Sequence, residues 1–478
     1  MNRKWMLAGL GLTAALPTAR AQKAPAENGA RNNVLFILCD DLRPELECYN
    51  HPVVKTPNIN RLAESGVVFN RAFCNVPVSG ASRASLLTGM RPTRNLFENW
   101  NVRVDRQVPE AVTLNQAFQE AGYTTVSNGK IFHHQDEASN RYWDDILPYR
   151  NPLDYHTEEN LAFMRIQEET GIRKRGWFHE AAGLPEERYL DGRTLRKSVD
   201  DLRKLAGRSE PFFLAVGFVR PHLPFVAPKK YWELYPPEEI EIPDNYVLKT
   251  DHRIPARALT HWGELLAYRG IPDTGPLSRD AARTMIRGYY ACVSFIDALI
   301  GQLLDELERL GLADNTTVVL TGDHGWNLGE HGMWCKHSVL ETSLRVPLII
   351  RTPGGLQGYR SNEIVELLDL YPTLCDVARL SEPAQLEGES LLPLLRDKQA
   401  RSKGYAVARW ENGFAYVEDR YSYTEWWDKD DRTVDRMLFD HTFDPEENYN
   451  VAGKPWYRHV VEELGGRLRE ARGRRFSE

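Results

Sequence analysis

Apolar runs that end in acidic residues recur along the chain. Residues 33–39 form a nearly continuous apolar run, typical of a central strand of a parallel sheet, and Asp40-Asp41 follows it. Thr316 to Thr321 is a second such run, and Gly322-Asp323-His324 follows it. A third strand is expected from Phe212 to Val216. Polar residues therefore end two of these predicted buried strands.

Helical patterns separate these runs. Thr56-Pro57 introduces a predicted helix over 58–64, and Val112 to Glu120 predicts a second, with a strand over 124–126 after it. A long helical pattern covers about 280–310 and Gly311 closes it. This alternation predicts an α/β fold with a large, mostly parallel sheet flanked by helices. The carboxyl ends of such strands are where a site is built.

The pattern changes after about residue 395. Short aromatic-rich segments at 405–410, 414–417 and 420–423 predict strands, with polar turns between them. A final helix is expected from Tyr457 to Arg469, although Gly465-Gly466 weakens that pattern. We therefore expect a smaller C-terminal antiparallel sheet with one helix packed on it.

Composition narrows the class of protein. The chain has 478 residues and a net charge of -7, which argues against a nucleic-acid partner. Residues 1–21 resemble a cleaved export signal, with an uncleaved anchor as the alternative. We expect no membrane span in the mature chain. The six cysteines are not in CxxC spacing, and most are expected to be buried thiols.

The acidic strand ends are candidates for a metal site. Asp40, Asp41 and Asp323 offer hard oxygen ligands, which suit calcium or magnesium rather than zinc. The simpler alternative is that Asp40-Asp41 caps a loop or helix. Asp323-His324 at the end of a second strand weakens that alternative.

The string Ser79-Gly80-Ala81-Ser82-Arg83, with Leu86-Leu87-Thr88-Gly89 after it, resembles the sulfatase signature. That resemblance implies an alkaline phosphatase-like fold, oxidation of Ser79 to formylglycine, and a role for Ser79 beside a bound calcium ion, with magnesium less favoured. A serine hydroxyl is a poor nucleophile, whereas an aldehyde hydrate carries two geminal hydroxyl groups.

Further strings are similar to other segments of the family. Gly129-Lys130-Ile131-Phe132-His133 implies that Lys130 contacts the sulfate and that His133 deprotonates the hydrate, with His134 as an alternative ring. Arg220-Pro221-His222 implies a general acid at His222. The resemblance also assigns metal ligation to Asp40, Asp41 and Asp323, with His324 as a ligand or hydrogen-bond partner. It implies a sulfate contact from Lys336, and Arg83 with the two lysines would offset the sulfate charge.

The strings resemble the iduronate 2-sulfatase branch and its bacterial uronate 2-O-sulfatase relatives. This implies a sulfated oligosaccharide substrate, with a 2-O-sulfated uronic acid in heparan or chondroitin sulfate fragments. Arg94, Arg103 and His337 are candidates for the uronate carboxylate, with ordinary structural charges as the alternative. Serine at position 79 resembles a bacterial subset activated by a radical maturase before export, so we expect a periplasmic or secreted protein.

Three other functions stay open. One is a phosphohydrolase or phosphonate hydrolase of the same superfamily, because phosphate and sulfate esters share a tetrahedral geometry. Another is a sulfatase acting on a different sugar position, which would share the signature. A non-catalytic glycan-binding protein would keep the fold without oxidation of Ser79. For a sulfatase we expect a signal peptide at 1–21, a catalytic domain at 30–395 and an α+β subdomain at 396–478.

Overall fold

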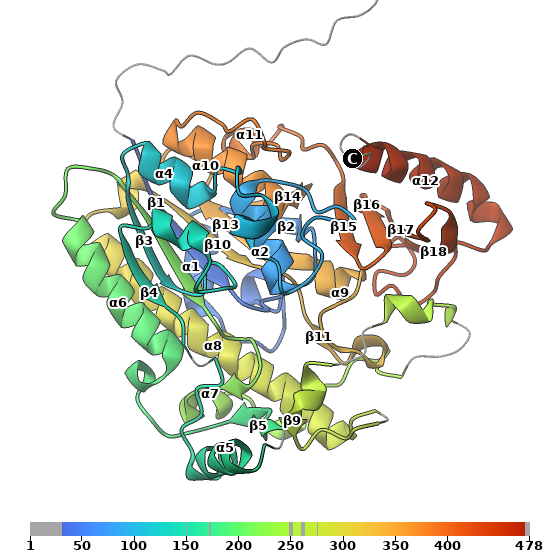
Figure 1. Cartoon of the computed structure of the whole chain (residues 1–478), viewed down its shortest axis with the longest axis horizontal. Helices are drawn as coiled ribbons and strands as arrows, with labels where there is room; N and C mark the ends of the chain where they lie inside the picture. The colour runs from blue at the N-terminus through green and yellow to red at the C-terminus, as the bar shows by residue number, and fades with distance from the viewer. Residues whose placement is uncertain are drawn as a thin grey trace, which may run out of the picture.

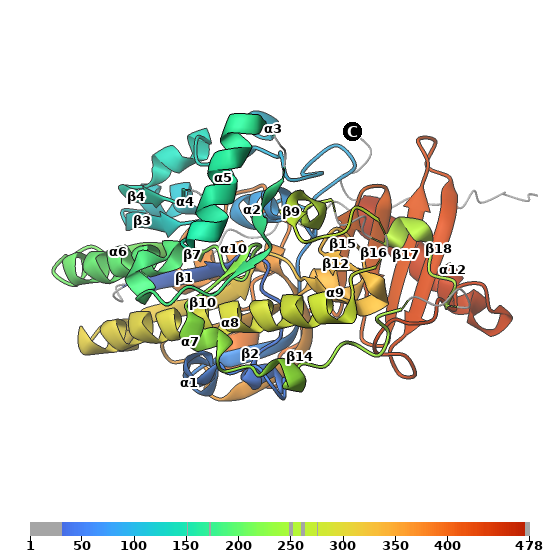
Figure 2. The ribbon, with the colours of Figure 1, turned by 90° about the horizontal axis from the view of Figure 1, so that it is seen from below.

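The computed structural model describes residues 31–150, 152–171, 174–247, 252–259, 263–274 and 276–473. The predicted signal peptide at 1–21 lies outside them. Figure 1 shows a large sheet flanked by helices, and Figure 2 shows the C-terminal sheet standing beside that body. The predicted α/β architecture with a second, smaller sheet is confirmed.

The large sheet has the strand order β14-β2-β13-β10-β1-β7-β3-β4. Its strands are β1 (Asn33–Cys39), β2 (Val67–Phe73), β3 (Thr124–Gly129), β4 (Asp145–Pro148), β7 (Phe212–Phe218), β10 (Thr316–Gly322), β13 (Arg345–Arg351) and β14 (Tyr359–Glu366). Neighbours pair in parallel except at β13, which is antiparallel to both β10 and β2. The sheet is therefore mostly parallel, as predicted.

Helices cover both faces of this sheet. The helices of the described residues are α1 (Pro57–Glu64), α2 (Ser79–Thr88), α3 (Val104–Gln107), α4 (Leu114–Glu120), α5 (Glu158–Thr170), α6 (Leu190–Leu205), α7 (Lys229–Trp232), α8 (Arg279–Arg309), α9 (Glu341–Leu344), α10 (Leu370–Ala378), α11 (Leu392–Arg396) and α12 (Arg458–Gly473), of which α12 packs on the C-terminal sheet instead. The predicted helices at 58–64, 112–120 and 280–310 correspond to α1, α4 and α8.

The central strand β1 divides its side chains between two cores. Leu35 and Ile37 point into one core, shared with α1, α6 and α8. Val34 and Phe36 belong to the other, shared with α2, α4 and α10. Alternate side chains of a strand face opposite sides of the sheet, so an uninterrupted apolar run is the pattern that fills both cores.

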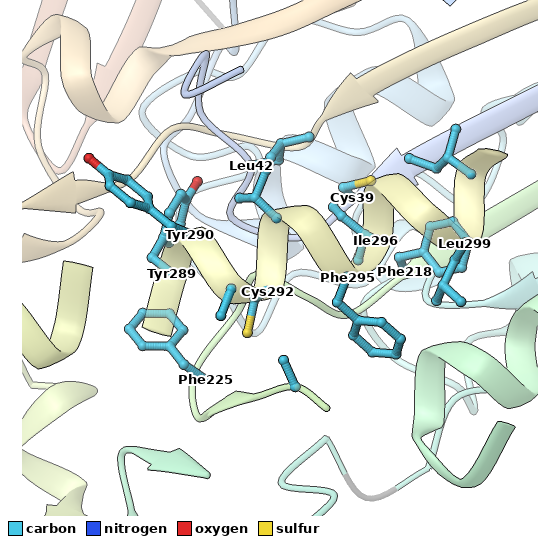
Figure 3. Close-up of a cluster of buried hydrophobic side chains, with 14 of the residues drawn as sticks. Cys39, Leu42, Phe218, Phe225, Tyr289, Tyr290, Cys292, Phe295, Ile296 and Leu299 are labelled. Atoms are coloured by element: carbon cyan, nitrogen blue, oxygen red, sulfur yellow. The ribbon is translucent and has the colours of Figure 1, made fainter. Parts of the chain in front are cut away.

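The middle of the long helix α8 is buried on all sides, in the first core. In Figure 3, Ile296 lies near Cys39 at the end of β1, Leu299 lies near Phe218, and Tyr289 lies near Phe225. The hydroxyl group of Tyr289 donates to the backbone carbonyl of Asp41, at 2.8 Å. The helix therefore supports the segment in which β1 ends, which is where the acidic residues lie.

The C-terminal sheet is antiparallel and contains β15 (Ala406–Trp410), β16 (Gly413–Val417), β17 (Tyr421–Trp427) and β18 (Thr433–Asp440). Helix α12 packs on it through a separate small core. The glycines at 465 and 466 do not interrupt this helix. Shorter strands complete the described elements: β5 (Arg175–Trp177), β6 (His179–Glu180), β8 (Phe225–Val226), β9 (Tyr268–Arg269), β11 (Asn327–Leu328) and β12 (Trp334–Cys335).

All six cysteines are buried free thiols, as expected for most of them. Among the helices of the described residues, none combines the length and the apolar character needed to cross a bilayer.

Candidate active site

Two adjacent parallel strands bring the acidic residues together. In the register of β1 and β10, Cys39 lies opposite Gly322, so the residues that follow each strand are neighbours. The backbone N–H of Asp41 donates to Oδ1 of Asp323 at 3.0 Å, and Asp41 takes the left-handed conformation, with φ of 63°. The side chains of Asp40, Asp41 and Asp323 are completely buried.

Four of these strand-end residues form a cluster fit for a metal ion. One ligand atom from each of Asp40, Asp41, Asp323 and His324 lies within 4.8 Å of the other three. The ring of His324 is oriented by its Nδ1, which lies 3.0 Å from the carbonyl oxygen of Gly325, so Nε2 faces the carboxylates. Three carboxylates with one imidazole fit a hard divalent cation such as calcium or magnesium.

The pKa values of the neighbouring residues Asp40 and Asp41 are shifted in opposite directions. Burial raises the pKa of Asp41 above its ordinary value, and Lys336 and His222 oppose that rise only in part. Burial also acts on Asp40, but Lys130, His222 and Arg83 outweigh it and hold its pKa well below the usual range. A bound cation would relieve the repulsion among these carboxylates.

Ser79 opens helix α2 directly beside this cluster. Its Oγ donates to Oδ1 of Asp40 at 3.0 Å and lies 3.0 Å from Nε2 of His324. The side chain is buried and occupies the first turn of the helix, where the helix dipole and free N–H groups favour negative charge. The hydroxyl oxygen therefore lies within hydrogen-bond distance of two of the four residues of the cluster.

Arg83 lies one helical turn after Ser79 and points to the same side. Its Nε donates to Oδ2 of Asp323 at 2.8 Å, and its Nη2 donates to Oδ1 of Asp40 at 3.1 Å. Nη1 donates to the carbonyl oxygen of Ile131 at 3.0 Å. This completely buried guanidinium joins two candidate metal ligands to the segment that follows β3.

Two buried lysines approach the cluster from different elements. Lys130 follows β3, and its Nζ donates to Oδ2 of Asp40. Lys336 follows β12, and its Nζ donates to Oδ1 of Asp41 at 3.1 Å. The same Nζ lies 2.8 Å from Oε2 of Glu264. One lysine ammonium group therefore lies beside Asp40 and another beside Asp41.

His222, in the segment after β7, is held by two carboxylates. Its Nε2 lies 2.9 Å from Oε1 of Glu264 and 4.0 Å from Oδ2 of Asp41. Burial lowers the pKa of His222, but Asp41 and Glu264 outweigh it, so the pKa is raised above its ordinary value. The ring is therefore suited to carry a proton near neutral pH.

Glu264 is a site residue that the sequence analysis missed. It belongs to an irregular segment before the short turn at Leu265–Ala267, with no motif around it. Burial raises its pKa, but Lys336 and His222 outweigh burial and hold it well below the usual range. A carboxylate in a loop carries no local signal, and only the fold brings it to His222.

His133 and His134 lie side by side, with ring centroids 4.9 Å apart. Burial and Lys130 lower the pKa of His133 to about 2, so its imidazole is neutral. Its Nδ1 is buried and has no hydrogen-bond partner in the described part of the chain. The charges acting on His133 include Lys130 and Asp40, whereas those on His134 are Arg103 and Asp136. Of the two rings, His133 therefore faces the cluster.

Arg94, Arg103 and His337, the candidates for binding the uronate carboxylate, have different neighbours. Nη2 of Arg94 lies 3.1 Å from Oδ1 of Asp431, and Nη1 of Arg103 lies 2.9 Å from Oδ1 of Asp136. Both guanidinium groups are thus already paired with acidic residues. The ring of His337, next to Lys336, packs on Trp410 with centroids 4.8 Å apart, and burial with Lys336 lowers its pKa to about 3.

The strand-end cluster of three carboxylates and one imidazole, next to a serine at the start of a helix, has the arrangement of a candidate hydrolase site. The family described as Sulfatase matches residues 32–380, and the family described as N-sulphoglucosamine sulphohydrolase, C-terminal, matches residues 329–474. The chain belongs to the sulfatase family, and it is a sulfuric ester hydrolase.

One relative supports the family from its sequence, and two solved structures share the fold. The iduronate 2-sulfatase of Mus musculus is 33% identical over 395 residues, covering 73% of this chain and 69% of the relative. The phosphonate monoester hydrolase SpPMH from Silicibacter pomeroyi has a similar structure, with a TM-score of 0.77, 22% identity and coverage of 93% of this chain and 96% of that chain. The structure of BT1596, a 2-O GAG sulfatase, gives a TM-score of 0.71, 24% identity and coverage of 93% and 92%. At these identities the structural matches show the shared fold.

Proposed function

We propose that this protein hydrolyses a sulfate ester of a sulfated glycan through a formylglycine made from Ser79. The observation that carries the proposal is the position of Ser79 Oγ, 3.0 Å from both Oδ1 of Asp40 and Nε2 of His324. Once formed, the aldehyde supplies a hydrate whose two hydroxyl groups offer a nucleophile for sulfur and a route to release sulfate.

Asp40, Asp41, Asp323 and His324 are proposed to hold a calcium ion, with magnesium less favoured, and residue 79 is proposed to complete the ligands. When bound, the cation lowers the pKa of a ligated hydroxyl and offsets the charge of the sulfate oxygens. Arg83 keeps two of these carboxylates in place through its hydrogen bonds to Asp40 and Asp323. Lys130 and Lys336 contribute positive charge on either side of the position of the sulfate.

Proton transfer is assigned to two histidines with opposite pKa shifts. The raised pKa of His222 supports a protonated ring that donates to the leaving sugar oxygen. The lowered pKa of His133 supports a neutral ring that accepts a proton from residue 79. Environments that separate two pKa values in this way are typical of acid and base pairs.

The substrate proposed is the 2-O-sulfate of a uronic acid in heparan or chondroitin sulfate fragments. Support comes from the similarity to mouse iduronate 2-sulfatase and to BT1596, a 2-O GAG sulfatase. His337 lies next to Lys336 and is proposed to face the uronate. Arg94 and Arg103 are proposed to reach the substrate from the rim, where acidic residues now hold them.

Export and maturation belong to the same proposal. The leader at 1–21 is proposed to direct the chain to the periplasm or outside the cell, and a radical maturase is proposed to oxidise Ser79 before export. The catalytic domain is proposed to extend over 30–395 and the C-terminal subdomain over 396–478.

A screen for sulfate release tests this function. Protein co-expressed with a maturase is incubated with disaccharides sulfated at the 2-O, 6-O or N position, and inorganic sulfate is measured. We expect release from the 2-O-sulfated uronate, and release from another position alone would change the substrate. Hydrolysis of phosphonate monoesters without sulfate release would favour the phosphonate hydrolase, and binding without turnover would favour a glycan-binding protein.

A further inference from the structure

Trp100, in the loop between α2 and α3, exposes its large apolar ring to solvent. The residue is 59% exposed, whereas Trp326 and Trp334 close to Lys336 are completely buried. A single exposed aromatic residue is common and does not by itself indicate a site. The position of Trp100 relative to Ser79 is the observation that suggests a role in substrate binding.

Backbone packing fixes Trp100 against the first turn of α2. A Cβ atom added at Gly80 would lie 2.2 Å from the carbonyl oxygen of Trp100, which is far closer than atoms can approach. Residue 80 therefore has to be glycine for this loop to rest on the helix. Since Gly80 follows Ser79 directly, the Trp100 backbone lies beside the proposed nucleophile.

The indole also lies on the side of the site where the proposed base is found. Its ring centroid is 6.5 Å from that of His133 and 6.5 Å from that of His134. His133 lies three residues after Lys130, whose Nζ donates to Oδ2 of Asp40, so these rings lie on the Lys130 side of the cluster. An exposed aromatic face is thus available next to the position that a sulfate ester would occupy.

The loop that carries Trp100 is anchored on both sides. Before it, Phe97 is completely buried and its N–H donates to Oε1 of Gln107 at 3.1 Å. Within it, the N–H of Asn101 donates to Oδ1 of Asn99 at 2.9 Å. After it, Arg103 is paired with Asp136. An aromatic ring on an anchored loop binds a ligand with little loss of conformational entropy.

We infer that Trp100 is a stacking platform for a pyranose ring of the glycan substrate, an inference that rests on the proposed function. The face of an indole carries partial negative charge, and the C–H groups on the face of a sugar carry partial positive charge, so the two surfaces are complementary. The sulfate group enters between Lys130 and Lys336, and the indole holds the sugar. Trp100 thus contributes to recognition of the carbohydrate and not of the anion.

The test compares Trp100→Ala with two other variants. Trp100→Phe keeps an aromatic face, and Trp456→Ala removes a tryptophan that is 66% exposed in the C-terminal subdomain. For each, kcat and KM are measured with a 2-O-sulfated glycosaminoglycan disaccharide, together with the inhibition constant of inorganic sulfate. Thermal unfolding shows that each variant is folded.

For Trp100→Ala we expect KM for the disaccharide to rise about tenfold, the loss of roughly one aromatic contact. The inhibition constant of inorganic sulfate stays at the parent value, because sulfate has no sugar ring to stack. Trp100→Phe keeps most of the affinity, and Trp456→Ala behaves as the parent. A parent KM in Trp100→Ala, or an equal loss for inorganic sulfate, overturns the inference.

Equilibrium binding separates this inference from the proposed function. The dissociation constant of the same disaccharide is measured in a Ser79→Ala background, with and without Trp100→Ala. About tenfold weaker binding in the double variant supports the platform even if the matured enzyme releases no sulfate. Equal binding by the two variants overturns the platform, and sulfate release by the parent would still support the proposed function.

Discussion

Oε1 of Glu264 lies 2.9 Å from Nε2 of His222. The other oxygen of Glu264 lies 2.8 Å from Nζ of Lys336. One carboxylate therefore fixes both the ring that follows β7 and the ammonium group that follows β12. A buried carboxylate in such a bridge stabilises both cations and sets their positions.

The variant Glu264→Gln removes the negative charge and keeps the shape. We expect kcat on glycan sulfate esters to fall by roughly tenfold to a hundredfold, because His222 loses the partner that holds its proton and its orientation. Activated aryl sulfates need less protonation of the leaving oxygen, so their loss is expected to be smaller. Glu238→Gln, at a surface carboxylate of the turn Pro237–Glu239, is the control. Equal loss on both substrates would argue against this role.

Replacing His222 itself tests the general acid directly. In His222→Ala we expect kcat on glycan esters to fall by about a hundredfold or more, with a much smaller effect on esters with good leaving groups. The measurement is a series of sulfate esters that differ in the pKa of the leaving alcohol. A steeper dependence on that pKa in the variant supports the assignment, and an unchanged slope would contradict it.

The metal cluster predicts a dependence on a divalent cation. Treatment with a chelator is expected to abolish sulfate release and to lower the melting temperature, because a ligand that binds only the folded state stabilises it. Calcium is expected to restore both. Elemental analysis should find about one calcium ion per chain in the parent and much less in Asp323→Asn. Full activity in metal-free protein would exclude the proposed site.

Stability in acid should depend on Glu45, whose Oε1 lies 2.7 Å from Nη2 of Arg43. Burial raises its pKa, but Arg43 and His51 outweigh burial and lower the pKa from 4.5 to about 2. A lowered pKa in the folded state contributes stability above the unfolded pKa of 4.5, and that contribution is lost as the pH falls towards about 2.

The variant Glu45→Gln lacks this titration. Above pH 5 we expect it to be less stable than the parent by about 3 kcal/mol, and the difference should shrink as the pH falls below about 4. Urea unfolding of both proteins across this range gives the comparison. A difference that stays constant with pH would show that Glu45 does not carry the effect.

Local patterns in the sequence predicted the elements that position the cluster. The apolar runs ending in Asp40-Asp41 and Asp323 became β1 and β10, because a strand buried on both faces has an uninterrupted apolar sequence. The string that resembles the sulfatase signature folds as helix α2, which begins at Ser79. The order of the motifs along the chain and the family resemblance further predicted that the lysines and histidines belong to the same site.

Other features depend on contacts between distant segments. The antiparallel direction of β13 and the strand β18 have no distinct local signal. Glu264 belongs to an irregular segment. Trp100 comes close to the site only because Gly80 lets its loop rest on α2. The pairing of Arg94 with Asp431 likewise joins residues far apart in sequence. None of these relationships is encoded in the spacing of neighbouring residues.

The mass of the peptide that contains residue 79 tests the central claim most directly. The protein is co-expressed with a maturase and shown to release sulfate from a glycan, and its digest is then examined by mass spectrometry. Oxidation of the Ser79 side chain to an aldehyde removes two hydrogen atoms, and we predict that mass change in the active preparation, with no sulfate release by Ser79→Ala. Sulfate release by a preparation that carries only unmodified serine at position 79 would contradict the account.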